Sequence, residues 1–233
     1  MPDTNRRLLL SAARLLKPLL DELVFVGGCA TGLLITDHAA ASVRQTFDVD
    51  AIAEIVSYSA YVEFGDRLRQ AGFAEDASEG APVCRWKCGS VLLDIMPLDQ
   101  TILGFSNRWY REAMNAAEAL TLEPALRIRH ITAPYFLATK LEAFNGRGGR
   151  DFFSSHDLED LLSVIDGRPE PSEEVRATRA DLRDYLALAF TGFLRDNRFI
   201  DALPGHMLPD AANAASQSRI PVLLKRIDEL ARQ

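Results

Sequence analysis

The chain has few cysteines, only Cys29, Cys84 and Cys88 among its 233 residues. An odd number of cysteines cannot pair completely, and the spacing from Cys84 to Cys88 has no second pair with which to form a zinc site. Composition therefore excludes a disulfide-stabilised secreted domain or a zinc module. We expect reduced thiols, which are typical of cytoplasmic proteins.

Long hydrophobic runs are also missing. No apolar stretch reaches the roughly 18 residues that a membrane-spanning helix needs. The segment 1–20 alternates basic and apolar side chains, and Lys17 and then Asp21 interrupt the pattern. This pattern predicts an amphipathic helix over 6–20 and not a signal peptide. We therefore expect a cytoplasmic protein with no membrane partner.

Positive charge is not in excess either. Lysine and arginine together number 26, aspartate and glutamate number 33, and the formal net charge is −7. A net negative field repels phosphate backbones, so the chain is not expected to bind nucleic acid generally. Any nucleotide or RNA contact has to come from a bound cation or from a local basic surface, and residues 127–150 have Glu142 as their one acid.

Hydrophobic residues make up 48% of the chain, enough to bury a core. Their spacing predicts strands and helices in the first half and helices alone in the second. We therefore expect an α+β fold with an α/β core over 1–131 and a helical C-terminal region over 132–233. Strands are expected at 23–26, 47–55, 83–87, 90–96 and 126–131, and helices at 6–20, 29–35, 58–71, 107–119, 135–145, 155–165, 170–195 and 220–231.

The first feature that points to chemistry is the strand-to-helix turn at Gly27-Gly28. Without side chains, the backbone of such a turn can approach a phosphate closely. The N-terminus of the following helix offers unpaired N–H groups and a partial positive charge. Gly-Gly turns also occur for structural reasons alone, so this turn indicates a phosphate site only in combination with other features.

The second feature is Asp48-Val49-Asp50 within a predicted strand. Residues two apart on a strand project from the same face, so the two carboxylates are expected within a few ångströms of each other. Their charges repel, and a divalent cation such as Mg²⁺ removes that repulsion. The alternative is a solvated strand face that carries two acids without a function.

The third feature is Asp94, a single acid within the apolar strand 90–96. A buried carboxylate needs a partner. That partner is either Arg85 or Lys87 on the preceding arm of a predicted hairpin, or a cation shared with Asp48 and Asp50. In the second case the three carboxylates form a metal site suited to in-line nucleotidyl transfer.

The helical half contributes basic and acidic candidates. Lys140 lies next to the apolar face of the helix 135–145, where it either binds a phosphate or belongs to a solvated face. Arg44, just before the Asp48 strand, either contacts a phosphate or braces Asp48. His156 begins a helix that Ser155 caps, and we interpret it as a helix-start residue and not as a base.

Together these residues resemble the DNA polymerase β-like nucleotidyltransferase superfamily, and within it the AbiEii/AbiGii-toxin type of bacterial nucleotidyltransferase. The resemblance runs from about residue 24 to residue 166, and five motifs in this order are more specific than any one of them. The motifs are Val26-Gly27-Gly28, Arg44-x-Thr46-x-Asp48-Val49-Asp50, Leu93-Asp94-Ile95, Lys140 within its helix, and Asp157-x-x-Asp160.

The resemblance implies a polymerase β-like core, a mixed sheet flanked by helices, with C-terminal helices that complete the active-site cleft. It implies Mg²⁺ or Mn²⁺ as cofactor and an NTP such as ATP as substrate. It implies metal binding and catalysis for Asp48, Asp50 and Asp94. It implies phosphate contact for Gly27, Gly28, Arg44 and Thr46. Lys140 is implied to neutralise the triphosphate, and Asp157 or Asp160 to position Lys140 or the acceptor.

The leading hypothesis is therefore transfer of a nucleoside monophosphate to a hydroxyl, with release of pyrophosphate. The toxin-type relatives imply an RNA or tRNA 3′ end or a protein side chain as acceptor, and an antitoxin protein as partner. The alternative is a non-catalytic nucleotide-sensing or protein-binding relative with the same fold. A structural metal-binding protein is a remoter option, because it leaves Lys140 and the Gly27-Gly28 turn without a role.

Overall fold

The computed structural model describes residues 4–146, 149–207 and 216–233. The chain forms two compact units. Unit 1 comprises Met1–Ala30 and Gln45–Thr132, and unit 2 comprises Thr31–Arg44 and Ala133–Gln233. The domain boundary expected between residues 131 and 132 stays a prediction.

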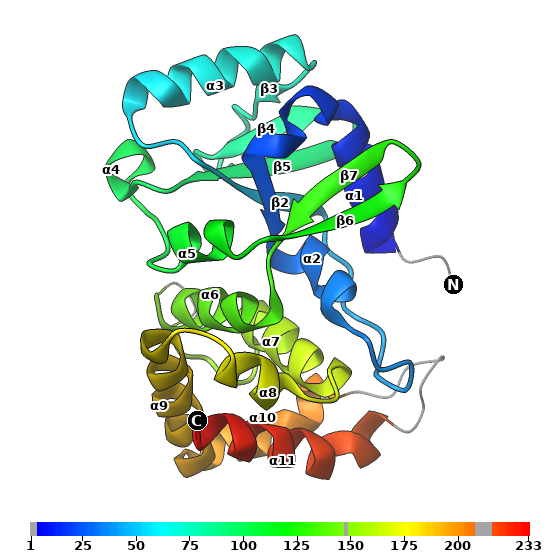
Figure 1. The fold of residues 1–233 in the computed structure, drawn as a ribbon, viewed down its shortest axis with the longest axis vertical. Coiled ribbons are helices and arrows are strands. Elements are labelled where there is room, and N and C mark those ends of the chain that lie inside the picture. Colours follow the sequence, from blue (N-terminus) through cyan, green and yellow to red (C-terminus); the bar gives the residue numbers. More distant parts are fainter. Residues whose placement is uncertain (1–3, 147–148, 208–215) are drawn as a thin grey trace. The chain divides into compact units, whose positions relative to one another are not determined.

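Unit 1 is built on a mixed sheet of seven strands in the order β3-β4-β5-β2-β1-β7-β6 (Figure 1). β2 runs parallel to β5 and β1 runs parallel to β7, whereas the other neighbours are antiparallel. This sheet with its helices confirms the expected α+β class. The strands are β1 Leu23–Val26, β2 Asp48–Ala53, β3 Ala74–Glu75, β4 Arg85–Cys88, β5 Val91–Pro97, β6 Glu118–Glu123 and β7 Leu126–His130.

The N-terminal helix is shorter than expected. α1 covers Thr4–Leu15, and a 3-10 helix over Lys17–Glu22 follows it. Pro18 explains the break, because proline has no backbone N–H with which to continue an α-helix. α1 packs against β2, β5 and β7.

The remaining helices of unit 1 are α3 Tyr58–Gln70, α4 Gln100–Leu103 and α5 Tyr110–Asn115. The side chain of Ser57 caps α3 by accepting the Ala60 N–H. α3 lies close to β4, since a Cβ atom on Gly65 would stand 3.1 Å from the ring of Trp86. This packing buries Trp86 on one face of the sheet and leaves the other face of β4 for Arg85.

Two further sequence expectations in unit 1 were wrong. The helix expected over 107–119 ends at Asn115, and β6 follows as an antiparallel partner of β7. Strand pairing with β7 overrides the helical propensity of this alanine-rich segment. The strand expected over 47–55 is shorter, since β2 covers Asp48–Ala53, and Phe47 just before it is 73% exposed.

Unit 2 consists of helices together with the segment Thr31–Arg44. Ser155 caps α7 as expected, by accepting the Leu158 N–H. In the described ranges no helix is both long and apolar enough to cross a membrane. The helices are α6 Ala133–Gly146, α7 His156–Gly167, α8 Pro171–Arg176, α9 Ala180–Arg195, α10 Asn197–His206 and α11 Ile220–Ala231, with a 3-10 turn at Ser216–Arg219 before α11.

The single helix expected over 170–195 is in fact two helices, α8 and α9. The break lies where the hydroxyl of Thr178 donates to the Val175 carbonyl and the Arg183 guanidinium donates to the Thr178 carbonyl. These side chains satisfy backbone groups at the break, which hydrophobic periodicity alone does not reveal. α10, which is not among the helices expected from the sequence, begins at the Asp196 cap.

The segment 31–44 is held firmly within unit 2. It begins in α2 (Gly27–Leu34), which starts in unit 1. The backbone N–H groups of Thr36 and Asp37 donate to the carbonyl of Gly167 at the end of α7, each at 2.9 Å. The guanidinium of Arg219 binds the carboxylates of Asp37 and Asp166, at 2.7 and 2.9 Å. This segment is therefore an integral part of the helical unit.

Candidate functional site

Four residues lie in one row across the sheet of unit 1. β1 pairs Val26 with Asp50, β2 pairs Asp50 with Asp94, and β5 pairs Asp94 with Arg85. Paired residues on neighbouring strands project from the same face of a sheet. Asp48, two residues before Asp50, shares that face. The structure therefore brings the three predicted carboxylates to one face and adds an arginine to them.

The turn at Gly27 is fitted to the carboxylate of Asp50. Gly27 has a φ of +64°, in the left-handed region that favours glycine. A Cβ atom at this position would stand 1.9 Å from Asp50 Oδ2 and 2.5 Å from Asp50 Cγ. The Sγ of Cys29, one residue beyond Gly28, lies 3.1 Å from the Val26 carbonyl and so ties the first turn of α2 to β1. Glycine is thus required at residue 27 by both backbone conformation and space.

Asp94 is paired with an arginine. Its side chain is 9% exposed, and both of its oxygens accept hydrogen bonds from Arg85, from Nε and Nη2 at 2.8 Å each. Of the two partners considered from the sequence, Arg85 is the one found, because Lys87 binds Asp76. The bidentate pair with Asp94 raises the pKa of Arg85, so the guanidinium stays charged.

Asp48 is held by two side chains. Arg85 Nη2 donates to Asp48 Oδ2 at 2.6 Å, and the hydroxyl of Thr46 donates to Asp48 Oδ1 at 2.9 Å. Thr46 is itself fixed by the buried Asn5, whose Oδ1 accepts the Thr46 N–H at 3.0 Å. Asn5 was missed in the sequence, because a contact between α1 and the start of β2 leaves no local pattern.

The donor set fits a divalent cation that brings further ligands with it. Among the residues that the structure describes, no three His, Cys, Asp or Glu side chains are grouped so as to hold a metal. Asp48 and Asp50 nevertheless offer two carboxylates on one face. Mg²⁺ at phosphoryl-transfer sites is usually held by one or two carboxylates, with water and phosphate oxygens as the remaining ligands. The side chains present suit that kind of site.

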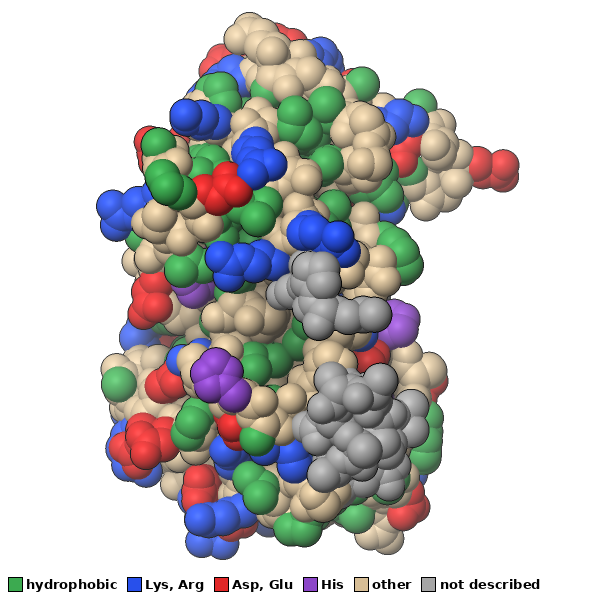
Figure 2. Space-filling view, turned by 90° about the vertical axis from the view of Figure 1, so that its right-hand side faces the viewer, with side chains coloured by type: hydrophobic (Ala, Val, Ile, Leu, Met, Phe, Trp, Pro, Cys, Tyr) green, Lys and Arg blue, Asp and Glu red, His purple; other side chains and the backbone are tan. Residues whose placement is uncertain are grey.

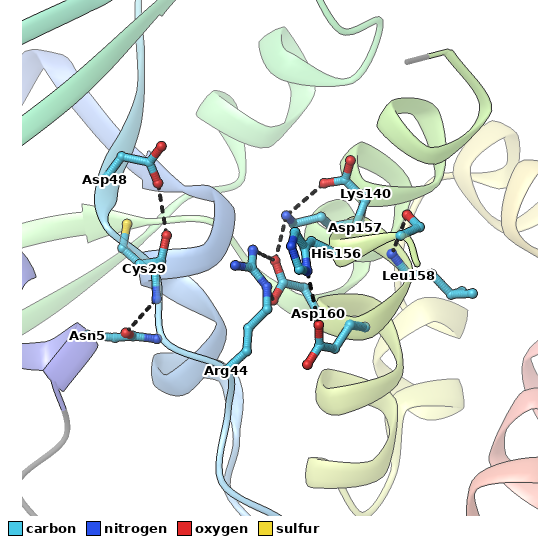
Figure 3. A network of polar contacts seen from close by, with 12 residues as sticks. Asn5, Cys29, Arg44, Asp48, Lys140, His156, Asp157, Leu158 and Asp160 are labelled. Atoms are coloured by element: carbon cyan, nitrogen blue, oxygen red, sulfur yellow. Dashed lines mark hydrogen bonds and ion pairs between the residues drawn. The ribbon is translucent and has the colours of Figure 1, made fainter. Parts of the chain in front are cut away.

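Unit 2 contains a second cluster of charged groups, centred on Lys140 of α6. Its Nζ donates to Asp157 Oδ1 at 2.9 Å and to Asp160 Oδ2 at 2.7 Å, both on α7 (Figure 3). Lys140 is 7% exposed and Asp160 is 1% exposed. Burial works to lower the pKa of Lys140, but the charges of Asp160 and Asp157 outweigh it and raise the pKa. The solvated-helix interpretation of Lys140 was therefore wrong.

Arg44 belongs to this second cluster. Its Nε and Nη2 donate to the two oxygens of Asp160, each at 2.8 Å. Burial opposes the charge of Arg44, but the hydrogen bonds to Asp160 raise its pKa overall. The structure thus gives Arg44 a carboxylate partner in unit 2, whereas the bracing of Asp48 is supplied by Thr46 and Arg85.

His156 is the first residue of α7, as expected. Its side chain is 74% exposed, and its Nδ1 lies 3.2 Å from the carboxylate of Glu159 one turn later. Asp157, the next residue, is the one that reaches Lys140. The expected assignment of His156 as a helix-start residue is confirmed.

Comparison with known proteins gives structural matches only. No family model and no curated protein matches the chain. Solved structures similar to it include an antigenic nucleotidyltransferase-like protein from Paracoccidioides brasiliensis, 17% identical, with a TM-score of 0.45 over 86% of this chain and 94% of that one. The protein JHP933 from Helicobacter pylori is 13% identical, with a TM-score of 0.47 over 98% and 88%. The functional argument therefore rests on the residues of this chain.

Proposed function

We propose that this protein is a nucleotidyltransferase, which transfers a nucleoside monophosphate from an NTP to a hydroxyl group and releases pyrophosphate. The observation that carries the proposal is the row Val26–Asp50–Asp94 with Asp48 on the same face. Three carboxylates from two adjacent parallel strands stand beside a glycine turn that opens a helix. This combination suits phosphoryl transfer, because catalysis of that reaction depends on positioning and on charge neutralisation.

Each residue of unit 1 has a defined task in this proposal. Asp48 and Asp50 bind the Mg²⁺ or Mn²⁺ of the metal–NTP complex. The cation, when bound, neutralises charge that develops on the phosphates. Gly27 and Gly28 contact the phosphates through their backbone at the start of α2, because a helix N-terminus favours negative charge. Asp94 is held in place by Arg85 and accepts the proton of the attacking hydroxyl.

The resemblance assigns neutralisation of the triphosphate to Lys140, which lies in the charged cluster of unit 2. Lys140 carries the positive charge, and Asp157 and Asp160 hold its ammonium in a fixed position. Arg44 binds both oxygens of Asp160, including the Oδ2 that Lys140 contacts, and so fixes that carboxylate in turn. A lysine positioned in this way binds phosphate by exchanging one carboxylate hydrogen bond for a phosphate oxygen.

The acceptor follows from the AbiEii/AbiGii-toxin resemblance, and we propose an RNA or tRNA 3′ end in preference to a protein side chain. The face in Figure 2 carries basic and acidic side chains side by side, which suits a local contact with one RNA end better than an extended RNA interface. Within the basic stretch 127–150, the exposed Arg127 of unit 1 supports such a contact, whereas Lys140 is buried against Asp157 and Asp160 and Arg147 lies outside the described residues. An antitoxin protein is the partner that this type implies.

The test is label transfer. Purified protein is incubated with Mg²⁺, each α-labelled NTP in turn, and total cellular RNA or whole extract. The natural chain is expected to label an acceptor, and the Asp48→Asn/Asp50→Asn double variant is expected to lose transfer. Asp66→Asn is the matched control, because Asp66 is an exposed acid on α3 that pairs with Arg69. Transfer that survives the double substitution overturns the catalytic assignment.

A nucleotide-sensing or protein-binding relative without activity is the second candidate. It is favoured by Arg85, which already neutralises Asp48 and Asp94. Tight binding of Mg–NTP without transfer to any RNA or protein would support this candidate over the enzyme. The position of the label separates the acceptors, since nuclease removes label from RNA and protease removes it from protein.

A further inference from the structure

Arg85 is placed between two carboxylates that the proposed function uses differently. One N–H of its Nη2 donates to Asp94 at 2.8 Å, and the other donates to Asp48 at 2.6 Å. Its Nε makes a second bond to Asp94. A guanidinium has five donors in a rigid fork, so it can bind one carboxylate with two bonds while it touches another with a third. Arg85 thus occupies a position from which a cation neutralises the acidic face, the face of the sheet that carries Asp48, Asp50 and Asp94.

The two ends of this bridge are not equally fixed. Arg85 and Asp94 are direct neighbours in the β4–β5 hairpin, and their side chains are 18% and 9% exposed. Asp48 is the first residue of β2, follows a segment without regular structure, and is 30% exposed. The pair with Asp94 has two bonds and backbone support, whereas the contact with Asp48 has one bond at a more open position.

We propose that Arg85 is a positioning residue that stays bound to Asp94 and releases Asp48 when a divalent cation binds to Asp48 and Asp50. The inference rests on the proposed function, since it assigns how that metal site is loaded. In the metal-free protein, Arg85 prevents repulsion between Asp48 and Asp94. Metal binding replaces a single hydrogen bond, and the bidentate pair keeps Asp94 in position for the attacking hydroxyl.

Competition between the Arg85 guanidinium and the metal for Asp48 has a measurable effect on metal affinity. Arg85 and the metal compete for Asp48, so the natural chain binds the metal less tightly than its carboxylates would allow. Loss of the guanidinium therefore strengthens metal binding, although it removes a stabilising contact. A purely structural arginine predicts no such gain, because its loss weakens the fold and leaves metal affinity unchanged or weaker.

The experiment is a titration of the purified full chain with Mn²⁺ alone, followed by electron paramagnetic resonance. Arg85→Gln removes the charge, and Arg85→Lys keeps the charge but cannot form the fork. Arg67→Gln is the matched control, because Arg67 forms an exposed ion pair with Glu22 elsewhere in unit 1. The rise in thermal midpoint caused by Mn²⁺ is measured for the same four proteins.

We expect Arg85→Gln to bind Mn²⁺ on the order of five- to tenfold more tightly, as the loss of one competing charge-assisted hydrogen bond predicts. Its midpoint should be lower without metal and should rise more on addition of Mn²⁺. Arg85→Lys should fall between Arg85→Gln and the natural chain, and Arg67→Gln should match the natural chain. Label transfer at saturating metal should fall in Arg85→Gln, because Asp94 is no longer held.

The outcomes separate this inference from the proposed function. Unchanged or weaker Mn²⁺ binding in Arg85→Gln, with binding that Asp48→Asn abolishes, overturns the role of Arg85 alone. If the natural chain and Arg85→Gln both lack saturable Mn²⁺ binding, the role of Arg85 and the two-carboxylate metal site fall together. A midpoint that drops in Arg85→Gln by the same amount with and without Mn²⁺ identifies Arg85 as structural and also overturns the inference.

Discussion

Asp50 Oδ2 occupies the space that a Cβ atom of residue 27 would need, at a separation of 1.9 Å. A side-chain carboxylate from β2 and the first residue of α2 are thereby fitted to each other. The same glycine has a φ of +64°. A substitution at Gly27, in the proposed phosphate-binding turn, therefore also disturbs Asp50, the proposed metal ligand.

Gly27→Ala should destabilise unit 1 by about 2–5 kcal/mol, because the left-handed backbone is strained for alanine and the Cβ overlaps Asp50. Denaturant unfolding measures the change. Gly192→Ala is the control, since Gly192 lies within α9 and nothing stands within 4 Å of its Cβ position. That control should be neutral or slightly stabilising.

The cost of Gly27→Ala should fall by at least about 1 kcal/mol in an Asp50→Ala background, because the overlap with the carboxylate is then removed. Strain from φ alone would remain. Equal costs in the two backgrounds would show that Asp50 does not determine the glycine at residue 27.

Asp94→Asn should lower label transfer by about 100-fold or more at saturating Mg²⁺ and NTP, which is typical of the loss of a general base. The fold should be retained, because Asp48 still neutralises Arg85. Initial rates for Asp94→Asn, the natural chain and Asp66→Asn test this. A rate within a few-fold of the natural chain would remove Asp94 from the chemistry.

Asp160→Asn should destabilise unit 2 by about 3–5 kcal/mol, because Lys140 and Arg44 lose a buried counter-charge. Calorimetry measures the shift. Glu159→Gln is the control on the same helix, since Glu159 pairs with the exposed His156 and should change stability by less than about 0.5 kcal/mol. Similar losses in the two variants would contradict the central place of Asp160 in the cluster.

Cys84 should resist alkylation at pH 8, whereas Cys88 should react. Burial first, and then the charge of Asp94, raise the pKa of Cys84 from 9.0 to about 12. The Cys84 thiol ionises at a lower pH in the unfolded chain than in the folded protein. The free energy of unfolding therefore falls as the pH rises from about 9 towards 12. Iodoacetamide labelling followed by mass spectrometry of the peptides tests the ranking. Labelling of Cys84 as fast as Cys88 in the folded protein would refute it, and urea should make the two equal.

The acidic face could be predicted in part. The alternation of a strand places Asp48 beside Asp50 without any knowledge of the fold. The pairing of Asp50 with Asp94 depends on the register between two strands that are distant in sequence, which no local pattern fixes. The partner of Asp94 was within reach, because Cys88 pairs with Val91 and a two-residue hairpin turn then sets Arg85 opposite Asp94.

The second cluster was harder to foresee. Arg44 and Asp160 are 116 residues apart in sequence, and only the tertiary fold joins them. The break between α8 and α9 depends on side chains such as Thr178 that bind the backbone locally, and such bonds compete with a helix without changing its hydrophobic pattern. Sequence periodicity therefore predicted where buried faces lie better than where helices end.

The path of residues 31–44 sets an order of events during synthesis. These residues leave the ribosome early, after Ala30 of unit 1, yet their partners in unit 2 are made after residue 132. Asp37 cannot form its ion pair with Arg219 until the 182 residues that follow it have been synthesised. The nascent chain can thus form the sheet of unit 1 while residues 31–44 are still without their partners. A truncated chain that ends after residue 131 would lack the helices to which residues 31–44 bind.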